Sequence, residues 1–141
     1  MNIEAIRKSN LVRRFHTCER IREETVGHHS ANVAALVLYL EPDAPRELLI
    51  AALMHDWPEQ YTGDIPAPAK WGSPQLADAL AQAEAVCWPQ LGVTVPPLHN
   101  HHAHILKLAD LLDLMLSCSE EMRRGNVEAS AVYNNGAAAL S

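Results

Sequence analysis

The chain has 141 residues, 48% of them hydrophobic and 20% charged, which is typical of a folded globular domain rather than a disordered segment. Its 11 lysines and arginines against 17 aspartates and glutamates give a formal net charge of −6, which argues against a nucleic-acid backbone as the main partner. No apolar run approaches the roughly 18 residues that span a bilayer, and Met1–Asn10 lacks the apolar core of a signal peptide, so we expect no membrane association.

Apolar residues recur with the helical period of about 3.6 residues, and strand signals are nearly absent. The segment Arg13–Gly27 is polar and is predicted to be a loop with a turn or two of helix. Asp43 is the expected N-cap of the third helix, with Pro45 in its first turn. Three helices are predicted in this part of the chain: Ile3 to about Val12, about His28 to Leu40, and Asp43 to about Trp57.

The second part of the chain begins with Tyr61–Ser73, where Gly and Pro residues predict an ordered loop rather than a helix. Ser73 and Pro74 start a helix that continues to about Trp88, after which prolines mark a break. The longest helix is predicted from about His102 to Arg124, and Asn126 can cap a final one. We therefore predict an all-α chain, with residues 1–141 forming a single helical-bundle domain of five to seven helices.

Three predicted helices carry an ionisable residue on an otherwise apolar face. His29 continues the stripe of Val33 and Val37, Asp56 follows the apolar face of the third helix, and Asp110 lies on the long helix. Buried carboxylates are costly unless they are paired, hydrogen-bonded or bound to a metal. A single histidine on such a face is more often a hydrogen-bonded core residue than a ligand, so the joint occurrence carries the prediction.

Together with His55, which precedes Asp56, these residues offer two imidazoles and two carboxylates. Such a mixed nitrogen and oxygen set suits a divalent ion such as Zn²⁺, Mn²⁺, Co²⁺, Ni²⁺ or Fe²⁺. Asp113, on the same predicted helix as Asp110, is the alternative for the last ligand. The sequence therefore predicts a metal centre of the kind used by hydrolases.

The order His29, His55–Asp56, Asp110 resembles the H…HD…D pattern of the HD superfamily of phosphohydrolases. Within it, Ala51–Trp71 resembles the signature HD-x-x-E-x-x-TGD-[IL]-P-x-P-x-K of the bacterial HD-domain 5'-deoxynucleotidases. The same pattern is similar to the phage deoxynucleoside triphosphate hydrolases that remove dATP in phages using 2-aminoadenine. Histidine directly after Phe15 favours this phage-like branch. Further matches are Val12, Arg14 and Phe15 upstream, Lys107–Asp110 downstream, and Glu120–Glu121.

The resemblance implies an HD fold and a role for each matching residue. His29, His55, Asp56 and Asp110 are the implied metal ligands. Glu59 is the implied general acid/base, with a surface carboxylate at a helix end as its alternative, and Asp64 is expected to hold the surroundings of Glu59 or the leaving group, with a purely structural turn as its alternative.

The implied substrate contacts come from basic and aromatic residues. Arg14 is the expected phosphate clamp, because a guanidinium matches phosphate oxygens with two hydrogen bonds. Phe15 is expected to pack on the sugar, although a core position is the competing interpretation. Lys107 and Lys70 are expected to reach a phosphate. For Lys70 the alternative is an exposed side chain without a role. Two departures from the family pattern are His28, where Glu is usual, and Phe15, where Trp is usual.

The implied reaction is hydrolysis of a deoxynucleotide at its 5' phosphoester, acting on a triphosphate or a monophosphate, with a divalent transition metal and, for a triphosphate, Mg²⁺. A homo-oligomer, a dimer or larger, is implied as well. The three cysteines are odd in number and widely spaced, which suits a reducing cytoplasm; the resemblance implies that of a bacterium or a phage-infected cell. The alternative is a non-catalytic HD module that binds or senses a nucleotide. The run His99–His104 has no assigned chemistry beyond adventitious metal binding or a subunit contact.

Overall fold

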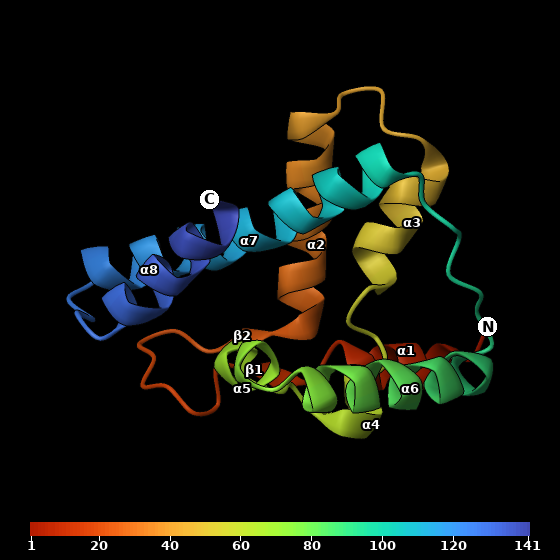
Figure 1. Ribbon diagram of the computed structural model, residues 1–141, viewed down its shortest axis with the longest axis horizontal. Coiled ribbons are helices and arrows are strands. Elements are labelled where there is room, and N and C mark those ends of the chain that lie inside the picture. The colour runs from red at the N-terminus through yellow and green to blue at the C-terminus, as the bar shows by residue number, and fades with distance from the viewer.

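The computed structural model describes residues 1–141 as eight helices and one two-stranded sheet (Figure 1). Seven of the helices are longer than four residues, so the predicted all-α class and helix number are confirmed. In chain order the elements are α1 (Ile3–Ser9), β1 (Arg13–Arg14), β2 (Glu24–Thr25), α2 (Val26–Leu40), α3 (Arg46–Met54), α4 (Glu59–Thr62), α5 (Ala67–Gly72), α6 (Pro74–Leu91), α7 (Asn100–Arg123) and α8 (Ala129–Leu140).

The core lies where α2, α3 and α7 meet. Figure 1 shows α7 crossing α2, with α3 beside them. Burial of apolar side chains is the main force that holds these helices together. This packing fixes the positions of the three helices relative to one another. The fully buried side chains of this cluster are Val33, Val37, Leu48, Ala52 and Ala109.

The remaining helices extend this core in two directions. α8 folds back along α7 (Figure 1), and Gly136 permits the close approach, since a Cβ there would lie 3.1 Å from atoms of Leu114 and Met115. α1 and α6 lie below the core, where the Asn2 amide donates to the Leu91 carbonyl at 2.9 Å. No helix of the chain is both long enough and apolar enough to cross a membrane.

Several predicted boundaries in the first half were wrong. The first helix ends at Ser9, and the segment after it forms no helical turn. Instead β1 pairs antiparallel with β2, with Arg14 opposite Glu24. Asp43 does not cap α3, because Pro45 occupies the N-cap position without a side-chain hydrogen bond, and α3 ends at Met54.

In the second half, the predicted loop over 61–73 contains the end of α4 and all of α5, which begins directly after Pro66. Ser73 caps α6 as predicted, accepting from the Leu76 amide at 3.3 Å, but the helix runs through Pro89. Asn126 does not cap α8, because its side-chain amide donates to the Glu19 carbonyl and to Glu121 instead.

Candidate active site

The predicted ligands come together at the junction of three helices. His29 lies on α2, His55 and Asp56 follow α3, and Asp110 lies on α7. The Nε2 atom of His29 is 3.2 Å from His55 Nε2, 3.3 Å from Asp110 Oδ1 and 3.5 Å from Asp56 Oδ2. Ligand atoms of His29, His55 and Asp110 all lie within 4.8 Å of one another.

The hydrogen bonds of the two rings show that this cluster fits a cation. His29 Nδ1 donates to Asp113 Oδ2 at 2.6 Å, and His55 Nδ1 donates to the Ala52 carbonyl at 2.8 Å. With Nδ1 protonated on both rings, each neutral imidazole presents its lone pair at Nε2. Two lone pairs facing each other at 3.2 Å repel unless a proton or a metal ion lies between them, so the donor set fits a divalent ion.

The titration of the cluster reflects the same demand for positive charge. Burial lowers the pKa of His29, but hydrogen bonds to Asp110 and Asp113 outweigh it and raise the pKa to about 9. Burial raises the pKa of Asp110, yet the hydrogen bond from His29 and the charge of Lys107 hold it well below its usual range. A proton on His29 therefore occupies the place that a metal ion would take.

Asp113 has a different place from the one that sequence reasoning considered for it. The residue is only 3% exposed, and its carboxylate contacts Nδ1 of His29, so it supports a predicted ligand from the side away from the cluster of Nε2 atoms. A carboxylate in this position fixes the tautomer of the histidine and makes it a stronger ligand. The only sequence signal was its position one turn after Asp110 on the long helix.

Glu59 opens α4, three residues after Asp56, and is 8% exposed. Its Oε2 atom is buried without a hydrogen-bond partner. Burial, together with the negative charges of Asp56 and Asp64, raises the pKa of Glu59 to about 9. The interpretation as a surface carboxylate is therefore wrong, and at neutral pH Glu59 carries a proton that it can donate.

A cavity of about 200 Å³ opens beside the cluster. It joins Glu59, Asp64, Asp56 and Asp110 to the residues predicted to contact substrate: Arg14, Phe15, Lys70 and Lys107. Part of its apolar lining comes from α5, α7 and α8, in residues to which the sequence assigned no role in the site: Trp71, Leu111, Leu114 and Val132, with Asn135 beside them.

Asp64 links two loops at the mouth of this cavity. Its carboxylate accepts the Phe15 amide at 3.1 Å, and its carbonyl accepts His16 Nε2 at 2.7 Å. Phe15 itself has a φ of 57°, a conformation that costs energy for a residue with a side chain. The ring is not in the core, because it packs against the guanidinium of Arg20, whose Cζ is 4.3 Å from the ring centroid.

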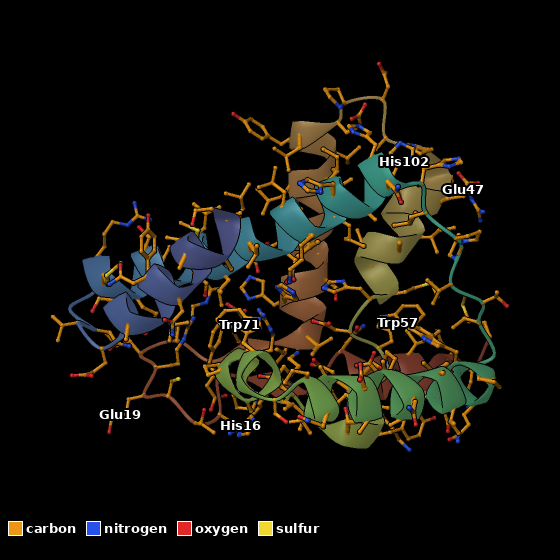
Figure 2. The ribbon with its side chains drawn as sticks, in the orientation of Figure 1. His16, Glu19, Glu47, Trp57, Trp71 and His102 are labelled. Carbon is orange, nitrogen blue, oxygen red and sulfur yellow. The ribbon has the colours of Figure 1, made fainter.

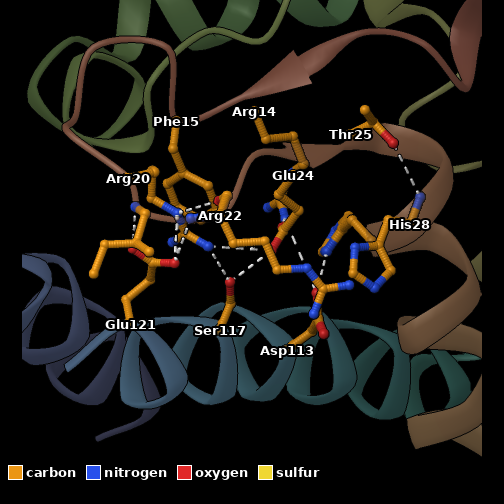
Figure 3. A network of polar contacts seen from close by, with 12 residues as sticks. Arg14, Phe15, Arg20, Arg22, Glu24, Thr25, His28, Asp113, Ser117 and Glu121 are labelled. Atoms are coloured by element: carbon orange, nitrogen blue, oxygen red, sulfur yellow. Dashed lines mark hydrogen bonds and ion pairs between the residues drawn. The ribbon is translucent and has the colours of Figure 1, made fainter. Parts of the chain in front are cut away.

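Arg14 reaches the cavity from a buried network (Figure 3). Its guanidinium pairs with Glu24. Burial lowers the pKa of Arg14, but the negative charges of Glu24 and other carboxylates outweigh burial and raise the pKa. Glu24 also accepts the Ser117 hydroxyl at 2.5 Å, and Ser117 accepts from Arg20 at 2.7 Å. The loop between β1 and β2 is held further by Glu121, which accepts the Ile21 and Arg22 amides at 2.7 and 3.0 Å.

Nearly the whole chain matches the model of one protein family. The model of the 5'-deoxynucleotidase YfbR-like family matches residues 2–141. The chain belongs to this family. The predicted resemblance is thereby confirmed, and with it the prediction that the chain is a hydrolytic enzyme.

Named relatives of the YfbR-like family agree. The chain is 32% identical to the 5'-deoxynucleotidase of Erwinia tasmaniensis, over 84% of this chain and 71% of that protein. It is 30% identical to 5'-deoxynucleotidase YfbR of Escherichia coli, with the same coverage. Each relative extends beyond the stretch that it shares with this chain.

Solved structures show the same fold. An HD-domain phosphohydrolase from Listeria innocua superposes with a TM-score of 0.77 at 21% identity, covering 98% of this chain and 77% of that one. The HD phosphohydrolase DatZ of cyanophage S-2L, described as bound to dA and one catalytic Zn²⁺ ion, gives 0.68 at 23% identity, covering 84% and 70%.

One departure from the usual YfbR-like pattern, His28, lies away from the four ligands. Its backbone amide donates to Thr25 Oγ1 at 3.4 Å, and its side chain lines a second, larger cavity of about 420 Å³. That cavity uses another face of α7 and is lined by Asp113 but by none of His29, His55, Asp56 and Asp110, so we assign the site to the smaller one. Figure 2 shows His102, from the histidine run, at the opposite end of the molecule from His16.

Proposed function

We propose that this chain is a metal-dependent phosphohydrolase that cleaves the 5' phosphoester of deoxynucleotides and releases the deoxynucleoside. The observation that carries the proposal is the pair of imidazole Nε2 atoms 3.2 Å apart, with Asp110 and Asp56 oxygens beside them. The names of the YfbR-like relatives support the substrate class, and the dA and Zn²⁺ described for DatZ support nucleoside and metal binding.

We propose His29, His55, Asp56 and Asp110 as the residues that hold the metal. When bound, a divalent ion such as Zn²⁺, Co²⁺, Mn²⁺, Ni²⁺ or Fe²⁺ would neutralise charge on a phosphoryl oxygen and lower the pKa of a water. For a triphosphate substrate, Mg²⁺ would accompany the polyphosphate tail.

The chain's own residues divide the remaining work. Arg14, Lys70 and Lys107 line the cavity and supply the positive charge that a phosphate needs inside a protein of negative net charge. Phe15 is placed to pack against the sugar, with its backbone held by Asp64. The apolar end of the cavity accepts the base.

Glu59 is the proposed general acid. A water attacks phosphorus in line, the bond between phosphorus and the 5' oxygen breaks, and Glu59 gives its proton to that oxygen. The proton released by the attacking water returns Glu59 to its protonated form, so the net reaction consumes one water. The phosphorus product is phosphate from a monophosphate or tripolyphosphate from a triphosphate, because the same bond is cut in both.

We further propose that residues 1–141 fold as a single HD-type domain and that copies of it associate, as a dimer or a larger assembly. Large apolar side chains exposed on several helices support association: Leu38, Tyr39, Leu53, Trp71, Val86 and Leu116. Light scattering on the purified chain gives the assembly mass directly. We also propose that the enzyme acts in the cytoplasm of a bacterium or a phage-infected cell.

The test is to incubate the chain with dAMP and with dATP in the presence of Co²⁺ or Mn²⁺ and to identify the phosphorus product. We expect phosphate or tripolyphosphate, and we expect Asp56→Ala to abolish turnover and to weaken metal binding. The matched control is Asp43→Ala, an exposed aspartate outside the site. Full activity of Asp56→Ala would refute this site, and no product from any nucleotide would favour a non-catalytic binding module.

A further inference from the structure

Asp113 is a buried carboxylate that belongs neither to the four proposed metal ligands nor to the proposed substrate contacts. Its Oδ2 atom accepts His29 Nδ1 at 2.6 Å and lies 3.9 Å from Nη1 of Arg14. The side chain of Asp113 is 5% exposed, that of His29 is 0% exposed and that of Arg14 is 11% exposed. One oxygen atom therefore faces both a proposed metal ligand and the proposed phosphate clamp.

On the His29 side, the contact decides which ring nitrogen is available. A carboxylate can only accept from Nδ1, so Nδ1 carries a proton, and the neutral ring that binds a metal keeps its Nε2 lone pair toward His55, Asp56 and Asp110. The negative charge of Asp113 also makes the imidazole a better donor to a cation. Without this carboxylate the ring is free to place its proton on Nε2, which would exclude a metal ion.

On the Arg14 side, Asp113 and Glu24 flank the same guanidinium (Figure 3). Glu24 is fixed in turn by the hydroxyl of Ser117, one turn beyond Asp113 on the same side of α7. α7 thus orients Arg14 at two points, directly through Asp113 and indirectly through Ser117 and Glu24. Only the first of these points also contacts the metal set.

We infer that Asp113 is a positioning residue shared by the metal centre and the phosphate clamp, so that metal binding and phosphate binding both depend on this one carboxylate. Both halves of the inference rest on the proposed function: the clamp half on Arg14 as a phosphate contact, and the metal half on His29 as a metal ligand.

The experiment compares Asp113→Asn with Ser117→Ala as the matched control. Asn keeps the size of the side chain and removes the charge, whereas Ala at 117 removes only the indirect support of Arg14. Three quantities are measured: Zn²⁺ affinity by competition with a chromophoric chelator, the tautomer of His29 by ¹⁵N NMR of the metal-free chain at a pH above about 9, where this ring is neutral, and inorganic phosphate affinity of the Zn²⁺-loaded chain.

For Asp113→Asn we expect a loss of Zn²⁺ affinity of about 10- to 100-fold, a proton shared between Nδ1 and Nε2 of His29, and weaker phosphate binding. For Ser117→Ala we expect Zn²⁺ affinity within about twofold of wild type and an unchanged tautomer, because a structural change that does not touch His29 should not alter its ligand strength. Phosphate binding of this control is expected to be weaker than that of the wild type.

Wild-type Zn²⁺ affinity and tautomer in Asp113→Asn would overturn the inference. Wild-type phosphate affinity in that variant would overturn the shared role. If circular dichroism shows that Asp113→Asn does not fold, Asp113→Glu is used in its place, because it keeps the negative charge but displaces it. Wild-type Zn²⁺ affinity in Asp113→Glu would then overturn the inference. A wild-type chain that binds Zn²⁺ but cleaves no nucleotide would contradict the proposed function and leave this comparison intact.

Discussion

The region formed by α2, α3 and α7 differs sharply from the region formed by α5 and α6. The first contains all five residues of the fully buried apolar cluster. It also carries the four proposed metal ligands, two on α2 and α7 and two in the turn that follows α3. In the second, α5 has no buried residue and α6 has only Cys87 and Leu91, while Trp71 and Val86 are 48% and 65% exposed.

This difference separates two requirements of the site. A metal ion needs ligands placed to within tenths of an ångström, which packed helix faces provide. A substrate must enter and leave, which is easier where few apolar contacts hold the chain and local opening costs little free energy. In the proposed function, metal chemistry therefore belongs to the packed half, the region of α2, α3 and α7, and substrate entry to the loosely packed half, the region of α5 and α6.

Glu59 stands at the boundary between the two regions, and its substitution has the largest expected effect. Glu59→Gln removes the transferable proton, so we expect kcat to fall by about 10²- to 10⁴-fold with little change in Zn²⁺ affinity. Steady-state kinetics and a metal titration measure both. The matched control is Glu84→Gln on α6, because burial raises the pKa of Glu84 too, but that residue does not line the cavity. A normal kcat in Glu59→Gln would remove Glu59 from the mechanism.

The packing difference itself predicts unequal costs for two truncations. Leu48 is fully buried in the core cluster, so Leu48→Ala should lower the free energy of unfolding by about 2–5 kcal/mol. Val86→Ala, on the exposed face of α6, should change it by no more than about 0.5 kcal/mol. Urea denaturation of the metal-free chains compares them. Similar losses for both would contradict the division into a packed and a loosely packed half.

The raised pKa of Glu59 also predicts a pH dependence of stability in the metal-free chain. A folded-state pKa of about 9 against an ordinary value of 4.5 means that the folded state binds this proton more tightly than the unfolded state. The contribution of Glu59 to the free energy of unfolding is therefore fully present below the ordinary pKa and is lost as pH rises toward about 9. Glu59→Gln cannot lose a proton there, so its stability relative to wild type should increase between pH 5 and pH 8.5. A constant difference across this range would show that Glu59 titrates normally.

The same comparison explains what the sequence could predict. The helical period places His29 on the buried face that Val33 and Val37 define, so its inward position followed from the pattern alone. The resemblance to the H…HD…D pattern predicted His55, Asp56 and Asp110 as partners of His29. All of these belong to the packed half, where burial enforces the periodicity.

The loosely packed half offered no such pattern. Pro66 and Gly72 were interpreted as loop signals, yet Pro66 stands at the N-cap of α5 and Gly72 at its end. Strands of two residues, such as β1 and β2, are too short to show alternation. The contact between His29 and Asp113 spans 84 residues, and no local rule predicts a pair so far apart in sequence.

The smallest expected effect concerns the two lysines of the cavity, which lie on opposite sides of this division. Lys107, on α7, is 61% exposed and pairs with Asp110 at 3.0 Å, whereas Lys70, on α5, has no such partner within salt-bridge distance. Solvent-exposed charge pairs contribute only about 0.2–1 kcal/mol, so Lys70→Ala and Lys107→Ala should each raise KM by up to about fivefold and leave kcat unchanged.

Salt distinguishes this screened attraction from direct catalysis. At about 1 M salt the Debye length falls to about 3 Å, so the KM of both variants should approach that of the wild type measured at the same salt. Lys107 should show the smaller change at low salt, because Asp110 already neutralises part of its charge. A fall in kcat for Lys70→Ala that persists at high salt would mean that α5 takes part in the chemistry, and the assignment of the loosely packed half to substrate entry alone would be wrong.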